Sequence, residues 1–338
     1  MSALRAAATA AALVTLALAG CGAPAGDPVE VTVPPGASFG AVVDSLALRG
    51  VVRSPTAFRA FARLRGDDRK VRSGTYVLTP GTGWKEILAI LTEGRVVTIP
   101  MTVPEGLRLD QIASRIARLV EADSADVLAF LRGDDAAERF AVPGPGLEGY
   151  LFPDTYRFAA GVPTQTVVEA MVGRYRRVWT PERRARLDSL GMSEGELVTL
   201  ASIVQAEARR TAEMPSIASV YHNRLRQGML LQADPTVLYA LGGYRERLLF
   251  AAIDSVAENP YNTYTQPGLP PGPIGAPGEE AIEAALHPAD EPYLYFVARY
   301  DGTHVFSRTL AEHNRAVAAT RAERARLRAE SRGSGESR

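Results

Sequence analysis

The chain has 338 residues, 46% of them hydrophobic, and its 38 basic and 38 acidic residues give a formal net charge of zero. This length allows about two domains, and the apolar content is sufficient for buried cores. The absence of excess positive charge argues against a nucleic-acid partner and against a broad polybasic membrane patch.

The N-terminus has the pattern of an export signal. Arg5 precedes an apolar run, residues 6–19, that is too short to span a bilayer. The run ends in Leu-Ala-Gly-Cys21, which resembles the lipobox of bacterial lipoproteins, although an ordinary signal peptide followed by an unmodified cysteine is the alternative. We expect a lipoprotein signal peptide over 1–20 and a lipidated Cys21 with a linker over 21–27. The mature protein would then be lipid-anchored to a membrane on its exported face, in the cell envelope.

A strand–turn–helix pattern occurs three times in the first third of the chain. Residues 31–36, 77–81 and 101–106 each combine a β-type run with a proline-containing turn and a glycine. Each is followed by a large apolar residue and then by apolar residues at helical spacing, beginning at Phe39, Trp84 and Leu109. The first two copies resemble LysM-like modules, which hold N-acetylated glycans in other proteins; a spacer domain is the alternative. We expect a LysM-like domain over 28–98.

The third copy is expected to open a second domain over 99–325, followed by a charged disordered tail over 326–338. Early in this second domain, residues 146–156 place Glu148, Tyr150 and Asp154 among glycines and a proline, which excludes a regular helix. These residues are candidate contacts with a substrate, and a packed aromatic turn is the alternative.

The most informative segment is residues 197–207. Ser193 and Glu196 form a capping box that predicts the start of a helix. Glu207 then shares one helical face with an apolar stripe, Leu200, Ile203 and Val204. Partial desolvation raises the pKa of a carboxyl, as a general acid requires. The alternative is a structural glutamate paired with Arg209 or Arg210.

Further candidates for substrate contact follow this helix. Pro215 allows a second helix, in which Asn223 lies on or beside the apolar face, and the position of Gly228 predicts the end of that helix. Beyond it stand Gln232, Asp234 and Thr236; because Pro235 follows Asp234, that aspartate is equally suited to be a helix N-cap.

Residues 259–278 are too rich in proline and glycine for regular structure. They carry Tyr261, Asn262 and Tyr264, whose rings and amide suit sugar C–H groups, hydroxyls and acetamido groups. A disordered linker is the alternative. The remainder predicts a helix over 279–287, a hairpin over 293–307 with an Asp-Gly turn, and a final arginine-rich helix.

Several kinds of chemistry lack their motifs. The four histidines are scattered without His-Glu-x-x-His, and there is no Gly-x-Ser-x-Gly elbow and no phosphate loop. We expect no metal and no cofactor. One desolvated glutamate is the remaining candidate for catalysis.

Taken together, several segments resemble the YceG-like family of endolytic murein lytic transglycosylases. They span roughly residues 28–320 in the family's order. The segments are 148–156, 201–207, 223–225, 234–236, 261–264, 268–272 and 293–297. The resemblance implies an α+β fold with a helical active-site core and a β-hairpin, with Glu207 as the catalytic acid.

The resemblance also implies the substrate and the partners: peptidoglycan strands, cut without hydrolysis to 1,6-anhydro ends, beside peptidoglycan synthases as a terminator of nascent strands. The chain departs from the family twice. Gln205 stands where many relatives carry a second glutamate, and a lipid on Cys21 would replace the usual transmembrane helix. A muramidase-type hydrolase using Glu148 or Asp154, and a non-catalytic glycan-binding lipoprotein, are the alternatives.

Overall fold

The computed structural model describes residues 26–243 and 250–335. The expectations for the signal peptide and for Cys21 therefore lie outside the described residues. The chain divides into two compact units, residues 1–100 with 157–162 and residues 101–156 with 163–338. The sequence placed the start of the second domain at residue 99 and did not anticipate the separate assignment of 157–162.

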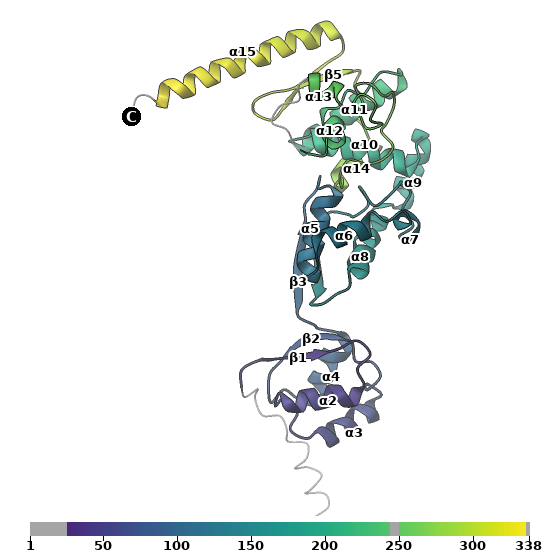
Figure 1. The fold of residues 1–338 in the computed structure, drawn as a ribbon, viewed down its shortest axis with the longest axis vertical. Coiled ribbons are helices and arrows are strands. Elements are labelled where there is room, and N and C mark those ends of the chain that lie inside the picture. Colours follow the sequence, from purple (N-terminus) through teal and green to yellow (C-terminus); the bar gives the residue numbers. More distant parts are fainter. Residues whose placement is uncertain (1–25, 244–249, 336–338) are drawn as a thin grey trace, which may run out of the picture. The chain divides into compact units, whose positions relative to one another are not determined.

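The first unit combines a two-stranded sheet with three helices (Figure 1). Strands β1 and β2 pair antiparallel with Val31 opposite Tyr76. The elements are β1 (Val29–Val33), α2 (Phe39–Leu48), α3 (Pro55–Arg65), β2 (Gly74–Leu78) and α4 (Trp84–Glu93). The predicted strand–turn–helix repeat is confirmed, since α2 and α4 begin at the expected Phe39 and Trp84. Helix α3 is not part of that repeat.

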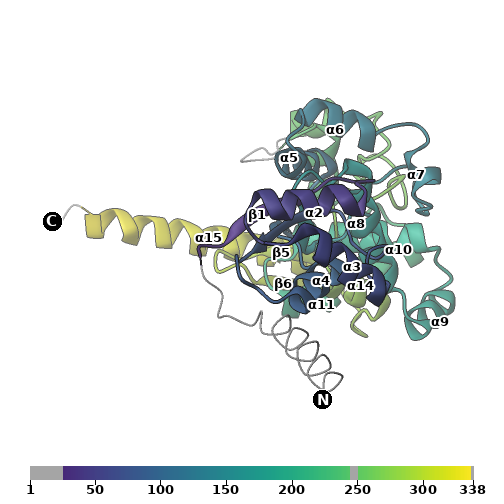
Figure 2. The same ribbon diagram turned by 90° about the horizontal axis from the view of Figure 1, so that it is seen from below.

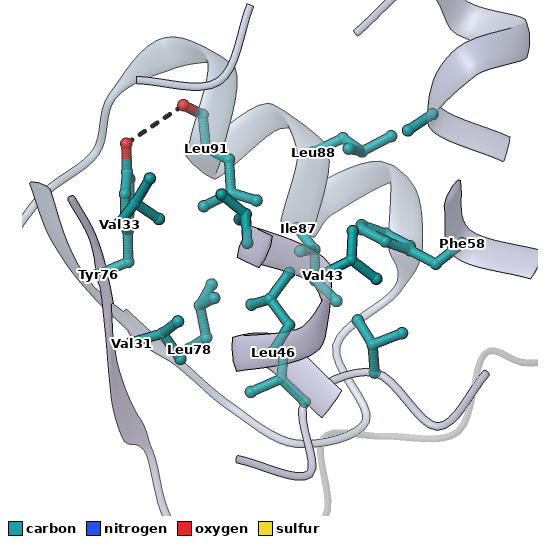
Figure 3. Packing of buried hydrophobic residues seen from close by; sticks show 14 residues of the cluster. Val31, Val33, Val43, Leu46, Phe58, Tyr76, Leu78, Ile87, Leu88 and Leu91 are labelled. Atoms are coloured by element: carbon teal, nitrogen blue, oxygen red, sulfur yellow. Dashed lines mark hydrogen bonds between the residues drawn. The ribbon is translucent and has the colours of Figure 1, made fainter. Parts of the chain in front are cut away.

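Alternation along the strands builds the core of this unit. Val31 and Tyr76 point inward with at most 2% of their surface exposed, while Thr32 and Thr75 pair on the other side of the sheet. Figure 3 shows Leu46 of α2 and Ile87 of α4 among the strand side chains. The Tyr76 hydroxyl donates to the Leu91 carbonyl over 3.3 Å, and a dashed line marks this bond in the figure. The apolar faces of the sheet and of the helices thus pack against one another and form one core.

The second unit is mainly helical and contains the sheet β5–β6. Residues 101–103 of β3 and 154–156 of β4 also belong to it, and the remaining residues of these two strands belong to the first unit. Strand β3 pairs with β4, and β5 pairs antiparallel with β6. The elements are β3 (Thr98–Val103), α5 (Leu109–Val120), α6 (Ser124–Leu131), α7 (Ala136–Arg139), β4 (Asp154–Ala159), α8 (Thr164–Val178), α9 (Pro181–Leu190), α10 (Glu194–Glu207), η1 (Thr211–Glu213), α11 (Met214–Arg226), α12 (Asp234–Ala240), α13 (Phe250–Asp254), α14 (Glu279–Leu286), β5 (Tyr295–Ala298), β6 (His304–Ser307) and α15 (Leu310–Gly335). The expected α+β class is confirmed.

Helix α10 is the centre of this unit. The capping box is present as predicted: the Glu196 amide donates to the Ser193 hydroxyl, and the Ser193 amide donates to the Glu196 carboxylate. Every side chain from Leu197 to Val204 is buried, so the helix has no single apolar face. The reason is that α11, α12 and α14 all contact it. The buried run ends at Val204, and Glu207 follows as the last residue of the helix.

Two local expectations differ from the structure. Asp234 is the first residue of α12, and the N-cap position falls on Ala233. Residues 326–335 continue α15 to Gly335, where the sequence predicted a disordered tail. The later turns of α15 project away from the hairpin β5–β6 of the same unit in both views (Figures 1 and 2).

Candidate active site

Glu207 is the last residue of α10, and its half-buried side chain is held by the next helix. The Tyr221 hydroxyl of α11 donates to Glu207 Oε1 over 3.1 Å. The pKa of Glu207 is raised from 4.5 to about 7, chiefly by burial and in addition by the negative charge of Asp234, while Tyr221 and Arg224 act in the opposite direction. A carboxyl with this pKa is about half protonated at neutral pH.

Tyr221 is fully buried behind the carboxyl. Burial and the Glu207 carboxylate hold the pKa of Tyr221 well above its ordinary value, so its hydroxyl stays protonated and acts as a donor. The ring of Phe296, from β5, packs edge-on against the Tyr221 ring with centroids 5.9 Å apart. The donor is therefore held by packing as well as by its hydrogen bond.

Arg224 brings a buried positive charge to the same site. Only 8% of its surface is exposed. Its Nε donates to the Leu294 carbonyl and its Nη1 to the Leu231 carbonyl, both over 2.7 Å, and its guanidinium lies 5.3 Å from the centroid of the Tyr295 ring. These bonds fasten the start of β5 and the segment before α12 to α11. Its charge also favours the ionised form of Glu207.

Asp234 and Tyr264 complete the group. The exposed Asp234 accepts a hydrogen bond from the Tyr264 hydroxyl over 2.5 Å. Burial, this bond and the Asp234 charge together raise the pKa of Tyr264, and Glu207 adds to the shift. We refer to Glu207, Tyr221, Arg224, Asp234 and Tyr264 as the Glu207 cluster.

Gln232 lies beside this cluster, just before α12. Its side chain is exposed and its backbone has φ of 48°, a left-handed conformation that is uncommon for residues other than glycine. Its amide donates to the Thr263 carbonyl over 3.0 Å, which holds this conformation against the loop 259–278. Such a strained, exposed residue beside a titratable carboxyl is a candidate for substrate contact.

Glu148 belongs to a separate group. It accepts hydrogen bonds from the Leu109 amide over 2.9 Å and from the Tyr239 hydroxyl over 3.2 Å. Burial raises the pKa of Glu148 to about 7. The Tyr261 ring packs against Tyr239 with centroids 4.8 Å apart. Within the described residues, no hydrogen bond or ion pair connects this group to Glu207.

Four of the predicted contact residues are buried in the protein: Tyr150, Asn223, Thr236 and Asn262. The Tyr150 ring is fully buried against Tyr175, with centroids 5.2 Å apart. The Thr236 hydroxyl is fully buried and bonds within the unit to the hydroxyl of Thr263. Contact with a glycan would require these side chains to leave their present partners.

Asn223 and Asn262 use their amides to hold backbone segments. The Asn223 Nδ2 donates to the carbonyls of Glu291 and Tyr293, both over 2.8 Å. The Asn262 Nδ2 donates to Ile253 over 2.9 Å, and its Oδ1 accepts from the Tyr264 amide. The loop 259–278 is thus tied to its surroundings through buried side chains, in contrast to a free linker. These asparagines position Tyr264 and β5.

The structural alternative for Glu207 does not occur among the described residues, where Glu207 has no ion pair. Arg210 instead donates to the Asp301 carbonyl over 3.0 Å. The described part of the chain also has no group of three or more histidine, cysteine or acidic side chains arranged to hold a metal. The arrangement at Glu207 supplies one carboxyl that exchanges a proton near neutral pH, which suits general acid and base chemistry.

The YceG-like family profile matches residues 31–319 of this chain. An endolytic murein transglycosylase of Bacillus subtilis (strain 168) is 34% identical over 304 residues, which cover 85% of this chain and 83% of that protein. The chain belongs to the YceG-like family. Another endolytic murein transglycosylase, from Streptococcus pneumoniae serotype 2, is 29% identical over 320 residues; the match covers 86% of this chain and 58% of that longer protein.

A solved structure agrees with this membership. The crystal structure of a YceG-like protein from Listeria monocytogenes has a TM-score of 0.59 to this chain at 33% identity, covering 86% of this chain and 99% of that one. Within this YceG-like chain, sequence reasoning missed the roles of Tyr221 and Arg224. The sequence pattern indicated Asn223 as the candidate on this helix and neither of these two residues. The available signal was a tyrosine and an arginine on the helix that directly follows the glutamate, next to Asn223.

Proposed function

We propose that this chain is an endolytic peptidoglycan lytic transglycosylase. The observation that carries the proposal is the setting of Glu207, whose half-buried carboxyl ends α10, accepts the Tyr221 hydrogen bond and has a pKa raised to about 7. Two relatives matched over most of this chain are named endolytic murein transglycosylases, which supports the substrate class. The bond cleaved is the one between N-acetylmuramic acid and N-acetylglucosamine.

The mechanism needs one carboxyl acting twice. The protonated Glu207 gives its proton to the glycosidic oxygen, the C1–O bond breaks, and positive charge develops at C1 of the muramic acid. The resulting carboxylate accepts the proton of the C6 hydroxyl of the same sugar, whose oxygen bonds to C1 and closes a 1,6-anhydro ring. No water is consumed, and Glu207 ends protonated. An internal nucleophile gains from proximity.

Four exposed or half-buried residues are proposed to contact the glycan. Gln232, Asp234 and Tyr264 lie in or beside the Glu207 cluster, and Tyr261 lies on the same loop as Tyr264. Tyrosine rings provide flat faces for sugar C–H groups, the Gln232 amide can donate to and accept from hydroxyls, and the Asp234 carboxylate accepts from them. Asn223, Asn262, Thr236, Tyr150 and Glu148 are proposed to support these residues.

A muramidase-type hydrolase is the second candidate. It requires a carboxylate to activate water. Asp154 pairs with Arg174 over 2.9 Å and Glu148 belongs to the separate tyrosine group, so neither is associated with Glu207. Asp234 is the carboxylate whose charge acts on Glu207, and it is exposed. A hydrolase would therefore use Asp234.

Digestion of peptidoglycan in water enriched in oxygen-18 separates the two candidates. The transglycosylase produces anhydro ends that contain no label. The hydrolase places one labelled oxygen at C1 of each new reducing end. Label in most new ends would overturn the proposed reaction and would direct attention to Asp234.

The N-terminal unit is proposed to be a LysM-like glycan-binding module. Its elements β1, α2, α3 and β2 follow in that order, and a pocket of about 310 Å³ lies between the β1–α2 and α3–β2 connections. Phe39, Asp68 and Arg69 are among its lining residues, which combine an aromatic face with polar groups. Calorimetry that measures the binding of N-acetylglucosamine oligomers to the Glu207→Gln variant, which is expected not to cleave them, tests this role. Arg69→Ala should weaken binding, and the exposed Arg53→Ala should not.

The chain is also proposed to work at the outer side of a membrane. Within 26–243 and 250–335, no helix combines the length and apolar character needed to cross a bilayer. The proposed anchor is lipid on Cys21, which would bring the enzyme close to peptidoglycan synthases and nascent strands. Metabolic labelling with a fatty acid tests it: Cys21→Ser should lose the label and leave the membrane fraction. Label retained in that variant would contradict the anchor.

A further inference from the structure

We propose that Tyr221 is a positioning residue for Glu207: its hydroxyl occupies Oε1, so that the transferable proton sits on Oε2, the oxygen directed to the glycosidic bond. This inference rests on the proposed role of Glu207 as the acid. It assigns to one hydrogen bond the choice of which carboxyl oxygen reacts.

The direction of the hydrogen bond follows from the chemistry of both groups. The Tyr221 hydroxyl lies 3.1 Å from Glu207 Oε1, and it is the only hydrogen-bond donor to that carboxyl among the described residues. Tyr221 stays protonated because burial and Glu207 raise its pKa well above the ordinary value. In a neutral carboxyl, the oxygen that accepts is the carbonyl oxygen, and the other carries the proton. Oε1 is therefore the acceptor, and Oε2 is the acid.

The Tyr221 ring is braced by the hairpin β5–β6. Phe296 meets it edge-on at 5.9 Å, and the His304 ring meets Phe296 edge-on at 5.3 Å. His304 Nδ1 lies 2.9 Å from Glu213 Oε2, just before α11, which ties the hairpin back to the same helix. This closed chain of contacts restricts the motion of the Tyr221 hydroxyl, so its aim at Oε1 is maintained.

The charges around Glu207 decide the sign of the effect on pH. Asp234 on α12 raises the pKa of Glu207, whereas Tyr221 and Arg224 on α11 lower it. Tyr264, from the loop 259–278, donates to Asp234 and leaves that charge in place. Removing the Tyr221 hydroxyl takes away one group that stabilises the ionised carboxyl. The pKa of Glu207 should therefore rise.

Tyr221→Phe tests the proposal, because it removes the hydroxyl and keeps the ring. The chain offers a matched control in Tyr175, which is also buried. Its hydroxyl donates to Glu194 Oε1 over 2.6 Å, and neither residue belongs to the Glu207 cluster. In Tyr221→Phe, the alkaline limb of kcat/KM against pH on purified glycan strands should move up by about one pH unit. We expect kcat to fall roughly tenfold with KM unchanged, less than the loss from removing the acid itself.

A second measurement is independent of activity. In protein labelled with carbon-13 at the glutamate carboxyls, the Glu207 signal is identified by its loss in Glu207→Gln. Its titration midpoint should rise in Tyr221→Phe and stay unchanged in Tyr175→Phe, while thermal unfolding shows that both variants fold. An unchanged midpoint together with an unchanged alkaline limb in Tyr221→Phe would overturn the inference.

Different results would reject the proposed function and the positioning role of Tyr221. If Glu207→Gln keeps normal cleavage, the proposed function is wrong whatever Tyr221 does. If Glu207→Gln is inactive and Tyr221→Phe behaves like Tyr175→Phe, the acid stands and the positioning role is rejected.

Discussion

The Tyr264 hydroxyl donates to Asp234 Oδ1 over 2.5 Å, which joins the loop 259–278 to the first residue of α12. Because Tyr264 is buried enough to have a raised pKa, it remains a donor and keeps the carboxylate oriented beside the Glu207 site. The Asp234 charge in turn raises the pKa of Glu207. The hydrogen bond between Tyr264 and Asp234 thus connects the position of the loop 259–278 with the pKa of Glu207.

Asp234→Asn should lower the pKa of Glu207 from about 7 toward its ordinary value, because it removes the nearby negative charge. The alkaline limb of kcat/KM is expected to move down by roughly one pH unit. Asp254→Asn, an exposed position on α13, serves as the control. A limb that moves upward, or equally in both variants, would contradict the charge effect.

The wild-type enzyme should lose activity as the pH rises through 7. The acid must be protonated, and a group with a pKa of about 7 is about half protonated at pH 7 and roughly one-tenth protonated at pH 8. Cleavage rates of purified strands between pH 5 and 9 measure this. A constant rate from pH 6 to 9 would show that Glu207 does not act as a general acid with this pKa.

Glu148 should make the protein less stable at alkaline pH. Its folded-state pKa of about 7 lies above the ordinary 4.5, so the folded protein binds more protons than the unfolded chain between these values. The contribution of the protonated Glu148 to the free energy of unfolding is complete below pH 4.5 and is lost as the pH rises through 7. Relative to wild type, Glu148→Gln should gain roughly 2–3 kcal/mol of unfolding free energy between pH 5 and 8. Urea unfolding measures this, with the exposed Glu182→Gln showing no such trend.

Much of the fold could be predicted because its signals are local. The Ser193–Glu196 capping box starts α10 where expected, and the Asp301-Gly302 turn lies between β5 and β6. The role of Asp234 was less readable, since Asp-Pro fits either the N-cap or the first turn, and the structure places it one residue inside the helix. Local chemistry determines that a helix begins, but tertiary contacts choose the exact residue.

The roles of several site residues could not be predicted from local pattern. Tyr221 has the spacing of a core residue, and only the fold reveals that its hydroxyl meets Glu207. Asn223 and Asn262 were expected to contact substrate because they are polar and stand in unusual segments. In the structure their amides bond to backbone carbonyls, and the partners of Asn223, Glu291 and Tyr293, lie far along the chain. Sequence spacing does not reveal such pairings.

Gly149→Ala should destabilise the second unit strongly. Gly149 has φ of 84°, and an added Cβ would lie 2.4 Å from Pro273 Cβ. Gly228 has φ of 65° with nothing within 4 Å of an added Cβ, so Gly228→Ala reports the backbone strain alone. We expect the first variant to lose roughly 2 kcal/mol more unfolding free energy than the second. Equal losses would show that the contact with Pro273 yields without cost.

Arg224→Met should loosen the hairpin as well as lower stability. The change leaves the carbonyls of Leu231 and Leu294 without their donor, which should cost about 3 kcal/mol. Hydrogen exchange should rise in residues 291–298, and Arg209→Lys, at an exposed position, should not alter it. Unchanged exchange there would argue that α11 does not hold β5 through Arg224.

The most direct test of the central claim is the mass of the glycan ends made by the full-length wild-type chain and by Glu207→Gln, with Glu182→Gln as a matched control. We expect ends one water lighter than reducing ends from the wild type and from Glu182→Gln, and none from Glu207→Gln. Anhydro ends formed at a normal rate by Glu207→Gln would contradict the assignment of Glu207 as the acid. Reducing ends from the wild type would contradict the transglycosylase reaction itself.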